Sequence, residues 1–451
     1  MTTHEVDVVV LGLGAGGEYA AQKLAEAGLA VVGVERDLVG GECPFYGCIP
    51  SKMMIRAADL VAESRRAASL SGQVDLRPDW SLVAERIDRQ ATNHWNDESH
   101  TTRLEEAGVE VVRGHGRLDG PGRVTVGEDT WVAARGVVLN SGTAPATLPI
   151  DGLEGTPYWT NREVVRLTEL PGSLAVIGGG PIGAELTQVF ARFGVTVTLI
   201  EALDRILGPE EPEAAAVVAR VFADEGIEVV TGAEVTRVEH DGGFRIHLGD
   251  RVVEADQLLV AAGRRPHLSD IGLDTVGLDP TARSVETDER MRAGERLWAV
   301  GDITGKGAFT HVSMYQGAVV VRDVLGEDGP WADYRAVSRV TFTDPEVGSV
   351  GLTERQAREQ GISVVTGHAD LPESSRGWIH QLGNEGIIKL VADADRGVLV
   401  GATSVGPSGG EVLGLLAAAV HAEIPIATLR GMHFAYPTFH RAVETALGDL
   451  V

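Results

Sequence analysis

The chain has 451 residues, more than one hydrophobic core usually organises, so its length predicts about three domains of ordinary size. Hydrophobic residues make up 43% and charged residues 23% of the chain, a globular composition that excludes extensive disorder. Its 65 acidic and 39 basic residues give a formal net charge of -26, which repels phosphate backbones and anionic lipids and therefore argues against nucleic acid as a partner.

The cysteine content and the apolar runs bear on where the protein acts. Two cysteines in so long a chain cannot form an extracellular disulfide framework. The first residues lack the cationic segment and the small-residue cleavage site of a secretory signal, and no later apolar run approaches the roughly 18 residues that span a bilayer. We therefore expect a cytoplasmic protein with no membrane partner.

The first predicted elements form a complete βαβ unit. A β-branched strand at 8–11 leads into a GxGxxG pattern, a helix is expected at 19–27, and a second strand at 30–34 ends at an acidic residue. The glycines are Gly12, Gly14 and Gly17, and the acidic residue is Glu35.

A second unit repeats the first almost element for element. A strand at 174–177 enters the same glycine pattern, a helix is expected at 185–193, and the next strand at 195–200 again ends at an acidic residue. Its glycines are Gly178, Gly180 and Gly183, and its acidic residue is Glu201.

The repeat gives a common pattern a specific meaning. A single GxGxxG also occurs in ordinary glycine-rich turns between a strand and a helix. In both copies here, however, the acidic residue lies 18 positions after the last glycine, close to the roughly 20 expected for a carboxylate that binds a ribose hydroxyl. The glycines let the backbone approach a pyrophosphate, and the helix N-terminus supplies donors. Two units predict two dinucleotides, typically a nicotinamide and a flavin.

The acidic residue of the second unit favours one nicotinamide over the other. A carboxylate at Glu201 would repel the 2'-phosphate of NADPH, so we expect NADH. Arg205, four residues on, could pair with that phosphate, and NADPH therefore stays possible.

The two cysteines lie in the segment GGECPFYGCIPSK at 40–52. Residues five apart in a regular helix are about 7.5 Å apart along its axis, too far for a relaxed disulfide, so a bridge requires irregular backbone. Pro44 and Gly47 supply that irregularity, and a helix starting near Pro50 would lower the pKa of a neighbouring thiol, which makes Cys48 the more thiolate-like partner of Cys43. The alternatives are two unconnected buried thiols and half of a zinc site.

This segment resembles the redox motif GGxCxxxxCxPSK of the class I flavoprotein disulfide reductases, the family of lipoamide dehydrogenase, glutathione reductase and mercuric reductase. Every defined position of the motif is matched, and the resemblance covers nearly the whole chain. Further segments similar to family motifs are NSGTAPATLPIDG at 140–152, AAGRRPHL at 261–268, WAVGDIT at 298–304 and TFTDPEVGSVGLTE at 341–354.

The resemblance implies a fold class and a division into domains. The fold would be α/β, with two Rossmann-like dinucleotide-binding domains for FAD and NAD(P) and a C-terminal α+β dimerisation domain, so that the protein is a homodimer. The expected domains are a split FAD-binding domain at 1–150 and 270–335, an NAD(P)-binding domain at 151–269, and an interface domain at 336–451.

The resemblance also implies roles for single residues. Cys48 would be the thiolate that faces the flavin and Cys43 the thiol that attacks an acceptor, with an ion pair between Lys52 and Glu185 near the flavin ring. The implied FAD-binding residues are Gly12, Gly14, Gly17, Glu35, Lys52, Gly142 and Asp302, of which Asp302 binds the ribityl chain. The implied NAD(P)-binding residues are Gly178, Gly180, Gly183, Glu201 and Gly263, and no metal site is expected.

The chain departs from the family at the C-terminal HPTxxE signature, whose histidine and glutamate serve the interchange thiol. Here the sequence reads YPTFHR from Tyr436 to Arg441. A tyrosine has an ordinary pKa near 10 and is a poor base at neutral pH, and losing a positioned base typically costs about a hundredfold to ten-thousandfold in rate. Mercuric reductases also carry tyrosine here, but the extra C-terminal cysteine pair found in them is absent from this sequence, which argues against mercury as the acceptor. His433 and His440 are nearby and could substitute, or could simply be packing or solvated residues.

Four hypotheses follow. The main one is a homodimeric FAD enzyme that passes electrons from NADH through Cys43 and Cys48 to an acceptor other than the standard disulfides, with Tyr436 included among the catalytic candidates. Phe45 and Tyr46 would then be either an apolar wall for the acceptor or local packing. The first alternative is a dihydrolipoyl dehydrogenase-like enzyme or another disulfide reductase. The second is direct flavin-to-acceptor transfer, as in a diaphorase or quinone reductase, and the third is a docking or sensing subunit that reports redox state to another protein.

Overall fold

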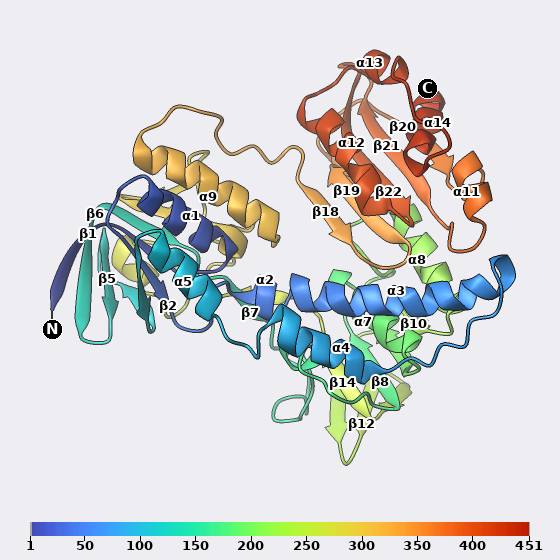
Figure 1. The fold of residues 1–451 in the computed structure, drawn as a ribbon, viewed down its shortest axis with the longest axis horizontal. Coiled ribbons are helices and arrows are strands. Elements are labelled where there is room, and N and C mark those ends of the chain that lie inside the picture. The colour runs from blue at the N-terminus through green and yellow to red at the C-terminus, as the bar shows by residue number, and fades with distance from the viewer. Residues whose placement is uncertain (1, 451) are drawn as a thin grey trace. The chain divides into compact units, whose positions relative to one another are not determined.

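The computed structural model describes residues 2–450, and its contacts divide the chain into two compact units, each built from separate stretches of sequence (Figure 1). The first unit contains residues up to 50, 85–146 and 264–333. The second contains residues 51–84, 147–263 and those from 334 on. The fold is mixed α/β, as expected.

The first unit is built on an eight-stranded sheet whose central strands are parallel. Strand β1 lies between β6 and β2, with Val8 opposite Gly136 on one side and Val31 on the other. The run β17-β6-β1-β2-β3 is parallel throughout, while β16, β4 and β5 add antiparallel pairs. The strands are β1 (Thr3–Leu11), β2 (Val31–Glu35), β3 (Val109–Arg113), β4 (Gly116–Leu118), β5 (Arg123–Val126), β6 (Asp129–Leu139), β16 (Arg292–Gly294) and β17 (Leu297–Ala299).

Parallel strands buried on both faces read as continuous β-branched runs, and VVVL at the end of β1 is such a run. Helices α1 and α9 lie side by side over this sheet (Figure 1). They approach closely because both contribute a glycine to the contact. A Cβ on Gly16 would lie 2.7 Å from the carbonyl oxygen of Ser313, and a Cβ on Gly317 would lie 2.9 Å from the carbonyl oxygen of Gly16. The unit's remaining elements are α1 (Ala15–Glu26), α2 (Glu42–Phe45), α5 (Glu98–Glu106), α9 (Thr310–Leu325), β7 (Thr143–Pro145), β15 (Arg264–Pro266), a π-helix (Ile87–Ala91) and 3-10 helices (Leu273–Val276, Gly301–Thr304).

The second unit contains the second βαβ motif of the sequence. Its strands form a four-stranded parallel sheet of order β10-β9-β8-β14. A three-stranded antiparallel sheet, β11-β12-β13, shares a buried core with it, in which Ile177 and Ile200 of the parallel strands meet Phe244 and Ile246. The elements are α6 (Asn161–Val164), β8 (Ser173–Ile177), α7 (Pro181–Arg192), β9 (Thr196–Ile200), α8 (Pro212–Asp224), β10 (Glu228–Val230), β11 (Arg237–His240), β12 (Phe244–Leu248), β13 (Arg251–Ala255) and β14 (Gln257–Val260).

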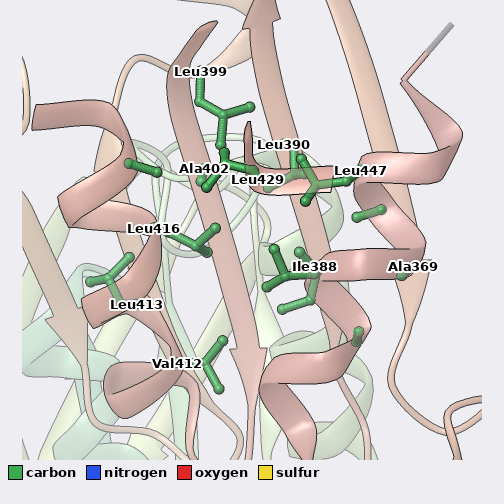
Figure 2. Close-up of a cluster of buried hydrophobic side chains, with 14 of the residues drawn as sticks. Ala369, Ile388, Leu390, Leu399, Ala402, Val412, Leu413, Leu416, Leu429 and Leu447 are labelled. Carbon is green, nitrogen blue, oxygen red and sulfur yellow. The ribbon is translucent and has the colours of Figure 1, made fainter. Parts of the chain in front are cut away.

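The C-terminal part of the second unit is a five-stranded antiparallel sheet of order β18-β19-β22-β21-β20. Its core lies between the sheet and α12 and α14, where Ile388 and Leu390 meet Leu416 and Leu447 (Figure 2). The elements are β18 (Ser338–Thr341), β19 (Glu346–Gly351), α10 (Glu354–Glu359), β20 (Val364–Asp370), α11 (Ser375–His380), β21 (Ile387–Asp393), β22 (Val398–Gly406), α12 (Gly409–His421), α13 (Ile426–Arg430), a 3-10 helix (Phe439–Arg441) and α14 (Ala442–Asp449).

Two further helices complete the chain. Helix α3 (Cys48–Leu70) begins at the second cysteine, and α4 (Trp80–Arg86) leads into the π-helix. Among residues 2–450, no helix is both long and apolar enough to cross a bilayer. The expected strands of both βαβ units are confirmed, but the expected starts at 19 and 185 were four residues late, because each helix begins directly after the second glycine of its loop.

Candidate active site

The first glycine loop follows β1 and turns sharply into α1. Gly12 has a φ of +97°, a conformation that side chains rarely adopt, and a Cβ there would collide with the carbonyl group of Asn140. A Cβ on Gly17 would overlap the carbonyl oxygen of Gly12, so the helix can pack this close to the strand only with glycine. Gly14 is the N-cap of α1 and has no side chain in front of the helix N-terminus. That geometry leaves the backbone donors of α1 open to an anion.

The second loop repeats this geometry between β8 and α7. Gly178 has a φ of +105°, where a Cβ would lie 2.7 Å from the carbonyl oxygen of Ala261, and a Cβ on Gly183 would overlap the carbonyl oxygen of Gly178. Gly180 caps α7, whose first residue is Pro181. Both loops therefore meet the steric requirement of a pyrophosphate cradle.

The two acidic residues at the strand ends are held by equivalent hydrogen bonds. Glu35 accepts from the backbone N–H groups of Leu13 and Asp37, both at 2.8 Å. Glu201 accepts from the N–H groups of Gly179 at 2.7 Å and of Leu203 at 2.8 Å. Each carboxylate is thus fixed beside its glycine loop, which is where an adenosine ribose would bind.

The surroundings of Glu35 affect its ionisation. Burial raises the pKa of Glu35 above its ordinary value, although the backbone donors of Asp37 and Leu13 oppose the rise. A bound ribose would donate hydroxyl hydrogens to the ionised carboxylate and favour that form. The glycine cradle and Glu35 together fit an ADP-containing cofactor in the first unit, and Glu201 with the second cradle fits another.

Arg205 is engaged within its own loop. Its guanidinium donates to the carbonyl oxygen of Gly208 at 2.9 Å and pairs with Asp204 at 3.3 Å. Those contacts hold the guanidinium within its own loop and use two of its five N–H donors.

The redox segment packs on the first glycine loop. Gly40 forms a parallel bridge with Gly14, and a Cβ on Gly41 would lie 2.9 Å from the Cα of Gly14. Gly41 has a φ of +70° and is the N-cap of α2, the one-turn helix that carries Cys43. Residues 46 and 47 interrupt the helical path before Cys48 starts α3. The predicted irregular backbone between the cysteines is confirmed.

The two cysteines differ in exposure and in surroundings. Cys43 is half-buried and Cys48 is exposed, which contradicts the alternative of two buried thiols. The Sγ atom of Cys48 lies 3.6 Å from the Oγ1 atom of Thr310, the first residue of α9. Thr310 was missed in the sequence, where only its position six residues after the 298–304 motif could have drawn attention to it. Within residues 2–450 no cluster of three or more ligating side chains suited to a metal ion was found.

Phe45, between the cysteines, is packing and not an exposed wall, because only 2% of it is exposed. Its ring contacts the ring of His100, with centroids 5.6 Å apart. His100 Nδ1 in turn lies 2.9 Å from the carboxylate of Glu18 in the first turn of α1. The redox segment is therefore braced against the helix of the glycine loop, through residues that the sequence did not single out.

Lys52 and Glu185 form the expected ion pair. Lys52 Nζ lies 2.8 Å from Glu185 Oε2, and the ammonium also lies 4.7 Å from the centroid of the Phe342 ring. The other oxygen of Glu185 accepts from the backbone N–H of Phe342 at 2.8 Å. Both carboxylate oxygens of this buried glutamate are satisfied, so the position of Lys52 is well defined.

Asp302 lies in the 3-10 helix before α9. Its Oδ2 atom accepts from the Thr143 hydroxyl at 2.7 Å, and Arg264 donates to the same hydroxyl at 2.7 Å. Gly142 and Gly263, which flank these residues, have φ values of +67° and +107°. One hydrogen-bonded group thus joins three sequence motifs, those at 140–152, 261–268 and 298–304.

Tyr436 and Arg441 occupy the positions of the missing histidine and glutamate. The Tyr436 side chain is 69% exposed, and the Arg441 guanidinium lies 5.6 Å from its ring centroid. Arg441 also forms an ion pair with Glu444 at 2.8 Å. His440 contacts the ring of Phe434, with centroids 6.1 Å apart, and His433 is exposed.

Two dinucleotide cradles on one chain, with a cysteine pair packed on the first, define a flavoprotein disulfide oxidoreductase. The chain belongs to the pyridine nucleotide-disulphide oxidoreductase family, whose model matches residues 6–317, and its dimerisation domain matches residues 337–447. Members of this family use FAD and NAD(P)H, and the dimerisation domain indicates a homodimer.

Several relatives align over nearly the whole chain. A dihydrolipoyl dehydrogenase from Halobacterium salinarum is 33% identical, covering 99% of this chain and 97% of its own. A mercuric reductase from Streptomyces lividans is also 33% identical, covering 98% and 95%. Among solved structures, a Cu(II) complex of the HOCl-induced flavoprotein disulfide reductase RclA from Escherichia coli has a TM-score of 0.87 at 25% identity, covering 99% of both chains.

Proposed function

We propose that this protein oxidises NADH and passes two electrons, through a disulfide between Cys43 and Cys48, to an acceptor other than a dialkyl disulfide. The observation that carries the proposal is the packing of the cysteine segment on the first glycine loop, through Gly40, Gly41 and Gly14. The first cradle would hold FAD with Gly12, Gly14, Gly17 and Glu35, while Lys52, Gly142 and Asp302 would contact the rest of the cofactor. When bound, FAD supplies the means of converting a hydride into electrons that reduce a disulfide.

The second cradle would hold the nicotinamide, through Gly178, Gly180, Gly183, Glu201 and Gly263. The bonds that fix Glu201 support NADH, because a 2'-phosphate would meet a carboxylate that cannot swing away. The engagement of Arg205 with Gly208 and Asp204 supports the same preference.

The place of Cys48 at the start of α3 supports the division of labour between the two cysteines. In each turnover NADH gives two electrons and a proton, a second proton comes from solvent, and the S–S bond is replaced by two thiol groups. The thiols then give both electrons to the acceptor, the S–S bond re-forms, and the two protons leave to the acceptor or to solvent. Cys48 starts α3, where the helix N-terminus favours its thiolate form, and Cys43 would react with the acceptor.

The residues at the C-terminal signature, Tyr436 and Arg441, support an acceptor whose reduction needs no strong base. Tyr436 can donate a hydrogen bond, and Arg441 beside its ring cannot accept a proton, so the pair cannot replace a histidine and glutamate. Thiophilic metal ions and quinones are acceptors of this kind. Mercuric reductases among the relatives and the Cu(II) complex of RclA favour a thiophilic metal ion as the first class to test, while the missing C-terminal cysteine pair weighs against Hg(II).

The decisive experiment is anaerobic titration with NADH. We expect a long-wavelength thiolate-to-flavin charge-transfer band in the purified protein and its loss in Cys48→Ser. Steady-state rates with Hg(II), Cu(II), quinones, lipoamide and glutathione disulfide should then be compared for the wild type and a Cys43→Ser, Cys48→Ser double variant. A double variant as active as the wild type with every acceptor would show direct transfer without the cysteines and refute the proposal. A requirement for a second protein would favour the sensing alternative.

The cysteine content also bears on where the protein acts. Two cysteines arranged for reversible redox chemistry suit a reducing compartment, and we propose the cytoplasm on that ground. Fractionation of cells that express a tagged chain tests it.

A further inference from the structure

The hydroxyl of Thr310 lies beside the sulfur of Cys48, although 262 positions separate the two residues. The Oγ1 to Sγ distance is 3.6 Å, within the longer range that the size of sulfur requires of its hydrogen bonds. Both residues belong to the first unit, and each is the first residue of a long helix, α3 for Cys48 and α9 for Thr310. The sulfur is therefore placed by two rigid elements and not by a loose loop.

We propose that Thr310 is the hydrogen-bond donor to the Cys48 thiolate and sets the ionisation and the redox poise of the cysteine pair. The inference deepens the proposed function and rests on it, because it takes Cys48 as the thiolate of the reduced pair. A thiolate has no hydrogen to give, so of the two atoms only the Thr310 hydroxyl can donate once Cys48 is ionised. Hydrogen bonds to an ionised partner are stronger than those to a neutral one.

The position of Thr310 suits this role. The N-cap of α9 is Phe309, so the Thr310 side chain does not serve as the cap of its helix. The contact favours the ionised dithiol state over the disulfide, whose sulfur is neutral and a weak acceptor. Loss of the hydroxyl should therefore raise the pH at which Cys48 ionises and make the pair harder to reduce. We expect a tenfold effect on both equilibria. For the ionisation of Cys48 this is one pH unit, and for the two-electron reduction of the disulfide it is about 30 mV.

The first measurement needs no turnover. Reduced holoenzyme is treated with iodoacetamide at a series of pH values, and alkylation of Cys48 is followed by peptide mass spectrometry. Thr310→Val removes the hydroxyl at nearly constant volume, and Thr310→Ala is a second variant without it. Thr310→Ser retains the donor, and Thr125→Val makes the same exchange on β5, where the hydroxyl bonds only weakly to the Arg117 carbonyl at 3.4 Å.

We expect the midpoint of Cys48 alkylation to rise by about one pH unit in Thr310→Val and Thr310→Ala, and to stay at the wild-type value in Thr310→Ser and Thr125→Val. Equilibration with dithiol buffers should show the pair tenfold harder to reduce in the same two variants. Flavin content and thermal midpoint establish that each variant is folded.

The outcomes separate this inference from the proposed function. If hydroxyl-free variants titrate like the wild type while the wild type shows a charge-transfer band with NADH, Thr310 has no such role and the proposed function stands. If Thr310→Ser shifts as far as Thr310→Val, packing and not the hydroxyl is responsible, and the inference is overturned. If the wild type shows no band, the proposed function fails first, and the role of Thr310 falls with it.

Discussion

Lys389 offers the sharpest test of how the second unit is held together. It lies on β21 with its side chain only 6% exposed, and its ammonium contacts carboxylates of Glu211 at 3.0 Å, Glu213 at 2.7 Å and Glu354 at 3.0 Å. These interactions raise the pKa of Lys389 despite its burial, so it stays charged throughout the physiological range. Lys389→Met replaces the ammonium by an apolar group of similar length.

The size of the effect follows from what the substitution leaves behind. Glu213 and Glu354 reach solvent and can be hydrated. Glu211 is 3% exposed and would lose the ammonium that it faces, while keeping one backbone donor, the N–H of Glu354 at 2.7 Å. Removing one partner of a buried ion pair typically costs about 3–5 kcal/mol. The remaining donor and the two accessible carboxylates place Lys389→Met near the lower end of that range, about 3 kcal/mol.

The assay is thermal unfolding of the holoenzyme followed by calorimetry. If the chain unfolds as a unit, its unfolding entropy is roughly 1 kcal/mol per kelvin, so about 3 kcal/mol corresponds to a midpoint lowered by about 3 °C. Lys23→Met is the matched control, because Lys23 contacts Glu26 at 2.7 Å on an exposed helix face, and surface pairs contribute little. We expect no resolvable change in that control.

A second variant tests the cause. Glu211→Gln combined with Lys389→Met removes the buried charge together with its partner, so the double variant should recover part of the loss. A Lys389→Met protein with the wild-type midpoint would refute the reasoning. A double variant that lost the full sum of both single effects would show that packing, and not the uncompensated carboxylate, accounts for the change.

Three further outcomes are expected. Burial raises the pKa of Asp59 to about 6 although Arg192 at 2.8 Å opposes the rise, so the folded chain holds this proton more tightly than the unfolded chain, and stability falls as the pH rises from about 4 through 6. Asp59→Asn should lack that fall in stability. Urea midpoints of the wild type and the variant would contradict this if both changed equally with pH. Glu201→Gln should lower the KM for NADPH about tenfold relative to that for NADH, and an unchanged ratio in steady-state kinetics would contradict it. Glu35→Gln should release FAD about tenfold more readily on dilution, measured by the recovery of free flavin fluorescence, and equal retention would argue against a ribose contact.

The sequence was sufficient wherever function depends on local backbone. Gly12 and Gly178 must be glycine because of their positive φ, and Gly17 and Gly183 because a neighbouring carbonyl leaves no room, and these demands produce a spacing that can be read directly. The helix starts were wrong for the same physical reason. Glycines at the start of α1 and α7 are poor helix formers, so propensity placed both starts beyond them, whereas packing against the strand forms the first turn.

The sequence was insufficient wherever function depends on contacts between distant segments. Thr310 meets Cys48 across 262 positions, and Lys389 meets Glu211 across 178. Neither threonine nor lysine has a neighbouring pattern that marks it, since its partner is brought near only when separate sheets and helices pack. Phe45 is a further example. The sequence left open whether its ring forms an exposed wall for the acceptor or is packed, and the contact with His100, which is distant in the sequence, supports packing.

The two βαβ units carry the same glycine strain and the same glutamate bonds, so neither feature distinguishes the flavin cradle from the nicotinamide cradle. What distinguishes them is the chain that follows the second strand. After β2 the backbone returns to Gly14 through Gly40 and Gly41 and delivers Cys43 and Cys48 beside the first loop. After β9 the corresponding segment instead secures Glu201 and Arg205. A reducible sulfur pair must adjoin the group that reduces it, so under the proposed function the flavin belongs to the first cradle.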